Sequence, residues 1–372
     1  MMNATDKTYQ IPVLNGFQKT LEAMFSAMLE KGGLDSLLIP KRTASGFYVP
    51  TLISDPNNVR DVNPFAGVMT INTATLISNI TRLAPSPSKI GVVLRPCEYR
   101  AYVELVKLKQ IHTENLITIV ADCPGTFTMT EYMNLVSKKS ADEEIAIIAE
   151  HGCEQRIACR TCVHCIPEGD AIDIKIHLFG IDTQKSVLLE GCTESGTNLL
   201  KNIGASETQM PGTVIKKQQE TVEARKKANA ELIPKEKEKF MGIENITKTF
   251  ETCISCHNCM DMCPICYCKE CFFESPTFEY EPENYIRWAE RKGSTRMPVG
   301  TVMFHLGRLN HMAVSCVACG MCEQACPAKI PLLTLFKSVG EDLQKTFEYL
   351  PGRSIKEPLP LIVYKEKELE PQ

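Results

Sequence analysis

Cysteine is the residue whose spacing points most directly to chemistry in this chain. Seven of the 18 cysteines lie between Cys253 and Cys271, and the first four follow the pattern C-x2-C-x2-C-x3-C-P. The same pattern recurs in CVACGMCEQACP, residues 316–327. Three thiolates spaced in this way wrap one iron–sulfur cluster, while the fourth reaches a neighbouring cluster. The proline after it lacks an N–H and helps to end the ligand loop.

The repeated motif predicts two 4Fe–4S clusters that exchange their fourth ligands. Cluster one takes Cys253, Cys256, Cys259 and Cys326, and cluster two takes Cys316, Cys319, Cys322 and Cys263. Zinc is the alternative, since four thiolates also bind zinc tetrahedrally. Two complete quartets that each end in Cys-Pro favour iron–sulfur clusters over zinc.

A third group of cysteines lies in HGCEQRIACRTCVHC, residues 151–165. Cys159 and Cys162 form a C-x2-C pair, and Cys153 and Cys165 flank it. This spacing predicts a metal site. The sequence leaves two possible quartets: the four cysteines of this segment, or the central pair together with Cys97 and Cys123.

The second quartet depends on an α/β fold. The apolar, β-branched runs 89–96 and 116–123 read as strands on either side of a helix over 98–110, which makes a βαβ unit with parallel strands. Cys97 and Cys123 each follow one of these strands. Because parallel strands end at the same sheet edge, where α/β proteins bind ligands, we expect these two cysteines to be neighbours.

The remaining elements predict an α/β N-terminal domain with a mixed sheet, followed by a mostly α-helical dicluster ferredoxin domain. Apolar periodicity indicates a helix over 17–29, and a helix over 72–83 has Asn72 as its cap. We expect domains at 1–205 and 246–350, a charged helical linker at 206–245 closed by Pro234, and a C-terminal tail at 351–372.

Three cysteines have no place in these quartets: Cys266, Cys268 and Cys271. They are expected either to hold a fourth cluster with a remote ligand, such as Cys153, Cys165 or Cys192, or to be soft neighbours that tune the dicluster. His164, His305 and His311 are not expected to be ligands, because a lone histidine beside a cluster is usually structural.

Composition excludes several classes of function. The net charge of −4 gives no basic stripe for nucleic acid, and no apolar run is long enough to span a membrane. No secretory signal is evident at the N-terminus. We therefore expect a cytoplasmic, reducing location, in which dense cysteines bind metal rather than form disulfides.

The motifs VLRPCEYRAYVELVKLKQ, IVADCPGTF and HGCEQRIACRTC resemble the beta subunits of coenzyme F420-reducing hydrogenases and formate dehydrogenases. CPICYCKEC, FHLGRLNHM and CVACGMCEQACP resemble the extra dicluster domain of the formate dehydrogenase version, which is similar to the α-helical ferredoxin domains of fumarate reductase and heterodisulfide reductase subunits. The resemblance covers most of the chain.

This resemblance implies an N-terminal domain with FAD beside one 4Fe–4S cluster. Its ligands would be Cys97, Cys123, Cys159 and Cys162. The flavin diphosphate would lie near a helix N-terminus, as helix ends favour anions. The candidate flavin residues are Gly67, Thr70, Asn72 and Gly180.

The leading functional hypothesis is an electron-transfer subunit of an anaerobic formate dehydrogenase. A molybdenum- or tungsten-dependent catalytic partner would supply electrons for a heterodisulfide reductase-like, NAD, ferredoxin or F420 acceptor. One alternative is a hydrogenase beta subunit. Another is a free-standing flavin-dependent F420 oxidoreductase, and a third is a ferredoxin-like scaffold without flavin.

Overall fold

The N-terminal half is built on one mixed sheet. The computed structural model describes residues 7–136, 138–150 and 152–363. Eight strands follow the order β3-β2-β4-β5-β6-β7-β1-β8. Their bounds are Lys7–Pro12 (β1), Ser36–Arg42 (β2), Tyr48–Ile53 (β3), Ile90–Leu94 (β4), Leu116–Ala121 (β5), Ile174–His177 (β6), Ser186–Gly191 (β7) and Ser206–Thr208 (β8). The strands from β2 through β4 and β5 to β6 run parallel, and the other pairs are antiparallel. The predicted α/β class with a mixed sheet is confirmed.

The predicted βαβ unit lies at the centre of this sheet. Strands β4 and β5 pair in parallel and are joined by helix α3 (Pro96–Lys107). The helix begins earlier than expected, because Pro96 suits the first helical turn, so Cys97 lies inside that turn. Cys123 follows the end of β5. Both cysteines are therefore at the carboxyl edge of the sheet.

Helices cover both faces of the sheet. On one face, α1 (Phe17–Glu30) buries Phe17, Leu21, Met24, Phe25 and Met28 against alternate strand residues, as its periodicity predicts. On the other face lie α2 (Thr73–Thr81) and α3. Asn72 caps α2 by accepting a hydrogen bond from the Ala74 N–H. The remaining N-terminal helices are α4 (Met129–Leu135), α5 (Ala141–Glu150), α6 (Ile157–Arg160) and α7 (Glu194–Asn202).

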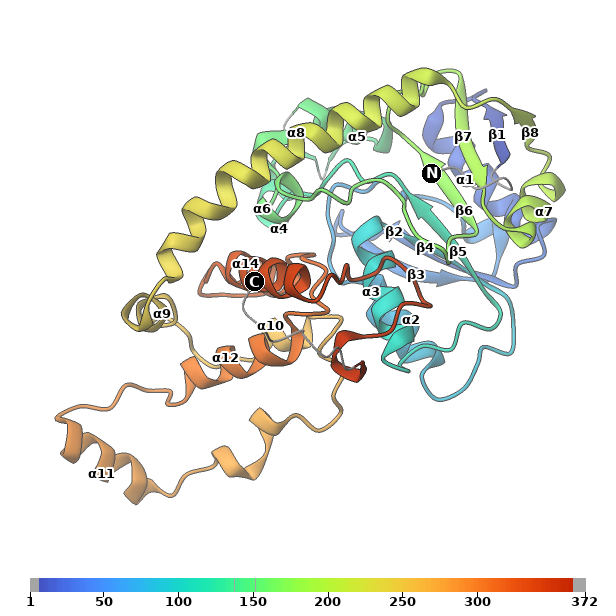
Figure 1. Cartoon of the computed structure of the whole chain (residues 1–372). Helices are drawn as coiled ribbons and strands as arrows, with labels where there is room; N and C mark the ends of the chain where they lie inside the picture. The colour runs from blue at the N-terminus through green and yellow to red at the C-terminus, as the bar shows by residue number, and fades with distance from the viewer. Residues whose placement is uncertain (1–6, 137, 151, 364–372) are drawn as a thin grey trace.

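The C-terminal half is helical and packs on the α2–α3 face, so that one apolar core joins the two halves. Its helices are α9 (Ile243–Thr249), α10 (Asn258–Asp261), α11 (Pro282–Lys292), α12 (Thr301–Met312), α13 (Met321–Gln324) and α14 (Leu332–Thr346). Figure 1 shows α11 standing apart from the rest, and no residue of that helix is buried. Among the described helices, none has the length and apolar character needed to cross a membrane.

The charged linker forms one long helix, α8 (Gly212–Lys237), which runs from the sheet to the helical half (Figure 1). The expectation that Pro234 closes this segment is wrong, since the helix continues past it. Helix α8 also packs against α14 and α6. It is therefore part of the packed structure rather than only a solvated connection.

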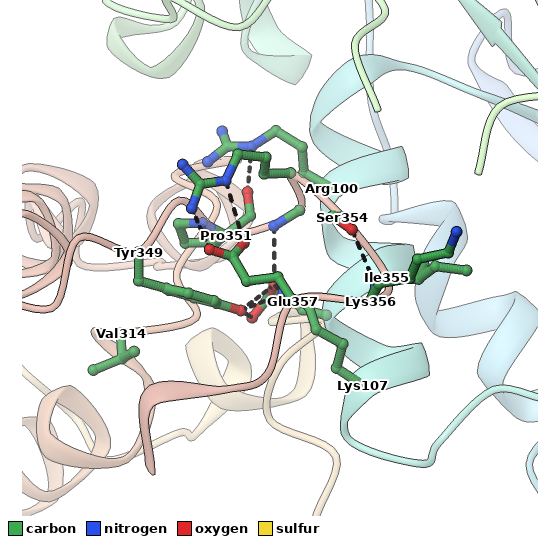
Figure 2. Close-up of polar contacts among 12 residues, drawn as sticks. Arg100, Lys107, Val314, Tyr349, Pro351, Ser354, Ile355, Lys356 and Glu357 are labelled. Atoms are coloured by element: carbon green, nitrogen blue, oxygen red, sulfur yellow. Dashed lines mark hydrogen bonds and ion pairs between the residues drawn. The ribbon is translucent and has the colours of Figure 1, made fainter. Parts of the chain in front are cut away.

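The segment after α14 returns to the N-terminal half. The Tyr349 hydroxyl donates to the buried carboxylate of Glu104 (2.6 Å), and the Gly352 N–H donates to the same group (2.9 Å). Arg100 of α3 donates from Nε to the Pro351 carbonyl (2.8 Å), as Figure 2 shows. Residues at the start of the expected tail thus fix the helical half against α3.

Candidate metal centres

The two cysteine motifs of the helical half fold into the same local loop. In the first motif, the residues on either side of Cys256 have positive φ angles: Ser255 at 52° and His257 at 57°. In the second, Ala318 at 55° and Gly320 at 72° flank Cys319 in the same way. A short helix follows each loop, α10 or α13. Alternating left-handed residues turn successive N–H groups toward one side, which favours a negatively charged cluster there.

The predicted set for cluster one comes together. Cys253, Cys256 and Cys259 line one cavity with Cys326, which comes from the end of the second motif. Burial raises the pKa of Cys259 to about 11, with the neighbouring thiols adding to the shift and Arg308 opposing it. Cys256 is exposed, so this set lies near the surface.

The predicted set for cluster two also comes together. Cys263, the last cysteine of the first motif, lies close enough to Cys316, Cys319 and Cys322 to raise the pKa of each thiol, although burial is the larger cause. The structure thus brings the fourth cysteine of each motif to the other motif's triplet, as expected from the spacing.

A third set gathers at the carboxyl edge of the sheet. Burial raises the pKa of Cys97 well above its usual range, and the nearest thiols, those of Cys123, Cys319 and Cys162, raise it further. Burial likewise raises the pKa of Cys123 to about 11, and Cys159 and Cys162 contribute. The two strand-end cysteines and the C-x2-C pair are therefore neighbours.

Cys159 differs electrostatically from the rest of this set. Burial alone would raise its pKa, but the Arg156 guanidinium and hydrogen bonds from Thr126 outweigh burial, so the pKa lies below the usual value. The N–H and the hydroxyl of Thr126 are both 3.3 Å from the Cys159 sulfur. This environment stabilises a thiolate, which is the form that binds iron.

For the other possible quartet, the four cysteines of residues 151–165, the structure describes three of the four side chains. Cys165 is buried beside the same set, and its carbonyl accepts a hydrogen bond from the Cys123 N–H (2.9 Å). The side chain of Cys153 lies outside the described residues. Cys192, at the end of β7, contacts Glu190.

Buried arginines lie beside the cysteine sets, and the sequence reasoning missed them. Arg308 of α12 donates from Nη1 to the Cys259 sulfur (3.1 Å). Arg156 holds its Nη2 3.7 Å from the Cys159 sulfur and donates from Nη1 to Gln324 Oε1 of α13 (2.9 Å). Arg225, from the charged helix α8, donates to the carbonyls of Cys123 and Pro124. An arginine within three residues of Cys159 was the one available signal in the sequence.

The cysteine sets differ from a site for a single ion. Within the described residues, no group of three or more His, Cys, Asp or Glu side chains is gathered closely enough to hold one metal ion. A zinc site would need such a group, with each sulfur about 2.3 Å from the metal. In this structure the described side chains are therefore not arranged as a zinc site.

The four candidate flavin residues have structural partners. The Gly67 N–H donates to the buried Glu144 carboxylate, and the Thr70 hydroxyl donates to the Tyr48 carbonyl. Asn72 is the cap of α2, and Gly180 packs against the backbone of Thr213 at the start of α8. Glu144 thus occupies the Gly67 amide, whereas the Asn72 Nδ2 is buried without a hydrogen-bond partner among the described residues. The flavin remains a prediction.

Comparison with known proteins supports iron–sulfur clusters in the helical half. Residues 213–330 match the model of the 4Fe-4S dicluster domain family. The chain is 27% identical over 367 residues to the beta subunit of an F420-dependent formate dehydrogenase from Methanocaldococcus jannaschii, covering 89% of this chain and 90% of that one. It is 29% identical over 369 residues to the beta subunit of F420-dependent formate dehydrogenase 1 from Methanococcus maripaludis, covering 89% of each.

A solved structure of the F420-reducing [NiFe] hydrogenase complex from Methanosarcina barkeri contains a similar chain. It has a TM-score of 0.47 and 12% identity, and the match covers 66% of this chain and 97% of that one.

The dicluster domain and its cysteine sets define an iron–sulfur protein. The family resemblance drawn from the sequence motifs is confirmed by the two formate dehydrogenase relatives. The chain is therefore similar, over 89% of its length, to beta subunits of oxidoreductases that are formate dehydrogenases.

Proposed function

We propose that this chain carries electrons through three 4Fe–4S clusters in a formate dehydrogenase complex. Cluster one would be held by Cys253, Cys256, Cys259 and Cys326, and cluster two by Cys316, Cys319, Cys322 and Cys263. An N-terminal cluster would be held by Cys97, Cys123, Cys159 and Cys162. The observation that carries the proposal is the packing of the second set on the third: a Cβ at Gly320 would lie 2.6 Å from the Cβ of Ala158, next to Cys159. It joins the dicluster to the sheet edge.

Each cluster would supply a site that accepts one electron at a time. The protein's own part is to hold the sites in order and to balance their charge. Arg308 lies beside Cys259 of the first set and near Cys263 and Cys322 of the second. Arg156 lies between Cys159 of the third set and α13 of the second. Buried positive charge at both junctions stabilises added electrons on either side.

Of the three proposed clusters, cluster one lies nearest the protein surface, at one end of the series. Cys256 is exposed, and its neighbour Ile254 is 61% exposed. Apolar surface next to an exposed ligand is suited to contact with another protein. The other end of the line lies at the sheet edge, beneath Arg225 of α8.

The partner would be a molybdenum- or tungsten-dependent catalytic subunit that oxidises formate. The names of the two relatives support formate as the electron source and F420 as an acceptor. A heterodisulfide reductase-like complex, NAD and ferredoxin are the other acceptor classes to be compared. A flavin would convert between one- and two-electron transfer, but the contacts of Gly67 and Gly180 do not support it at those positions.

The test is anaerobic purification of the complex, followed by metal and flavin analysis. We expect at least about twelve irons per chain and reduction of the clusters by formate. Cys97→Ser should remove about four irons and leave the dicluster spectrum in place, whereas Cys192→Ser should remove none. About eight irons in the unmodified chain, or an unchanged iron content in Cys97→Ser, would contradict the N-terminal cluster. One FAD per chain would restore the flavin prediction.

A further inference from the structure

Cys266, Cys268 and Cys271 have no place in the three clusters, yet they share one cavity of about 620 Å³. Helix α12 supplies the other potential ligand to this cavity, His311, and two thioethers line it as well, Met260 and Met312. The remote cysteines considered from the sequence, Cys165 and Cys192, are not among the lining residues. Three thiols and one imidazole thus face the same space.

We propose that this cavity holds a fourth 4Fe–4S cluster, bound by Cys266, Cys268, Cys271 and His311. Sequence alone predicts a structural role for His311, but its surroundings differ from those of His305. The His305 ring is buried, stacks on Phe250 at 4.1 Å between centroids, and has its Nε2 3.4 Å from the Cys253 sulfur. The His311 ring is exposed and, in the described part of the chain, its nitrogens have no hydrogen-bond partner. An imidazole whose nitrogens make no other hydrogen bond is available as a ligand.

The other side chains of the cavity are chemically suited to a cluster. The Cys266 sulfur lies 2.8 Å from the Met312 sulfur, and the Cys271 sulfur lies 3.4 Å from that of Met260. The Cys271 thiol thus faces a soft, uncharged atom, whereas the Cys266 thiol also lies beside the Cys263 thiol and the Arg308 guanidinium. As in the two dicluster sets, the described side chains do not gather around one point as they would for a single ion. The assignment to a cluster rests on the size of the cavity, about 620 Å³, which is more than one ion needs, and zinc is an outcome of the test.

The site would be a side branch of cluster two. The Cys266 N–H donates to the carbonyl of Cys263, a predicted ligand of cluster two (3.1 Å), and Arg308 lines the cavity. On the outer side, Cys268 is exposed and Leu361 is 71% exposed. Replacement of thiolate by imidazole raises the potential of an iron–sulfur centre. A fourth cluster here would therefore draw electrons from cluster two toward a second exposed position.

Iron analysis of the anaerobically purified complex tests this proposal. The proposal of a fourth cluster rests on the proposed function only for the number of the other clusters. The variants distinguish a failure of the fourth cluster from a failure of the other three. The unmodified chain should contain about sixteen irons, and Cys268→Ser should lose about four while keeping the signals of the other three clusters. His311→Ala should lose the same four, and His311→Cys should retain them with a lower potential for that cluster alone.

Cys192→Ser is the matched control, and it should change neither iron content nor spectra. The proposal is overturned by an iron content that is the same in Cys268→Ser and the unmodified chain. It is also overturned by one zinc per chain that disappears in Cys268→Ser, or by His311→Ala with its full iron content. Loss of iron in Cys97→Ser bears only on the N-terminal cluster, so the failure of one proposal is distinguishable from that of the other.

Discussion

In the helical half, each triplet of cysteines lies within one short loop, whereas the N-terminal set comes from three separate segments of the chain. The two loops share the same pair of positive φ angles around their middle cysteine. At the sheet edge, by contrast, Cys97 and Cys123 are placed by the parallel pairing of β4 with β5. Cys159 lies on a third segment, and its sulfur contacts Arg156 of that segment and Thr126 of the loop after β5.

This difference determines which substitutions should disturb each centre. The position of cysteines within one short loop depends mainly on the residues of that loop. The position of cysteines from distant segments depends on every contact that holds those segments together. The loop after β5 shows this dependence, since the Gln155 side chain donates to the Pro124 carbonyl (3.0 Å) and the Arg156 N–H to the Thr126 carbonyl (3.0 Å). Changes away from the cysteines should therefore affect the N-terminal set more.

The largest expected effect comes from Gly125→Val. Gly125 has a φ of 111°, and a Cβ there would lie 2.0 Å from Gln155 Oε1, so valine must displace the loop that carries Cys123. We expect loss of about four irons with the dicluster signals retained, measured by iron analysis and electron paramagnetic resonance.

Ala318→Gly is the control in the helical half. Glycine adopts the positive φ of residue 318 more easily than alanine does, so the variant should keep its iron. If Gly125→Val and Ala318→Gly lost the same amount of iron, or if neither lost any, the proposed contrast between the N-terminal set and the helical half would be wrong.

A smaller effect is expected from Arg156→Gln. This change removes a buried positive charge beside Cys159 and should lower the potential of the N-terminal cluster. A hydrogen bond to a charged group contributes about 1.5–3 kcal/mol. That energy corresponds to roughly 60–130 mV for one electron, because about 59 mV is a tenfold change in equilibrium.

Redox titration checks this shift, with Arg156→Lys expected to restore part of it. Arg287→Gln, on the outlying helix α11, is the control and should leave every potential unchanged. A potential for the N-terminal cluster that is the same in Arg156→Gln and the unmodified chain would show that the guanidinium does not act on it.

The change expected to leave every cluster intact is a pH-dependent change in stability at Glu144. Burial raises the pKa of this carboxyl from 4.5 to about 7, although the Gly67 N–H opposes the shift. Because the folded-state pKa is the higher one, its contribution to stability is complete below about pH 4.5 and is lost as the pH rises through about 7. Glu144→Gln stays neutral and should be more stable than the unmodified protein by up to about 3 kcal/mol at pH 8.

Anaerobic thermal unfolding between pH 5 and 8 checks this expectation, and the advantage of Glu144→Gln should grow with pH. Glu143→Gln is the control on the same helix, because Ser140 hydrogen bonds lower the pKa of the exposed Glu143. An advantage that does not change with pH would contradict a protonated Glu144.

Much of the site could be predicted from the sequence because its signals are local. The two C-x2-C-x2-C-x3-C-P motifs specify their loops within a few residues, and the alternating helix and strand patterns place Cys97 and Cys123 at one sheet edge. The exchange of Cys263 and Cys326 between the triplets also follows from spacing alone, and the structure places both cysteines accordingly.

Contacts between segments distant in sequence were beyond such reasoning. The helix α8 looked solvated because its composition is charged, yet its Arg225 reaches the carbonyl of Cys123. Gly67, Thr70 and Asn72 looked suited to a phosphate, but whether an N–H is free depends on Glu144, which a separate helix brings to it. His311 looked ordinary until its position beside three cysteines was known.

The ligand chemistry could be read from the residue order, because the spacing of thiolates within a short loop lets three of them bind one cluster. Only the tertiary structure decided how the centres follow one another. Packing of the helical half on α3 brings Cys319 close to Cys97 and seats buried arginines between the sets. Electrostatic effects of this kind depend on distance and burial, and neither can be read from the local spacing of residues along the chain.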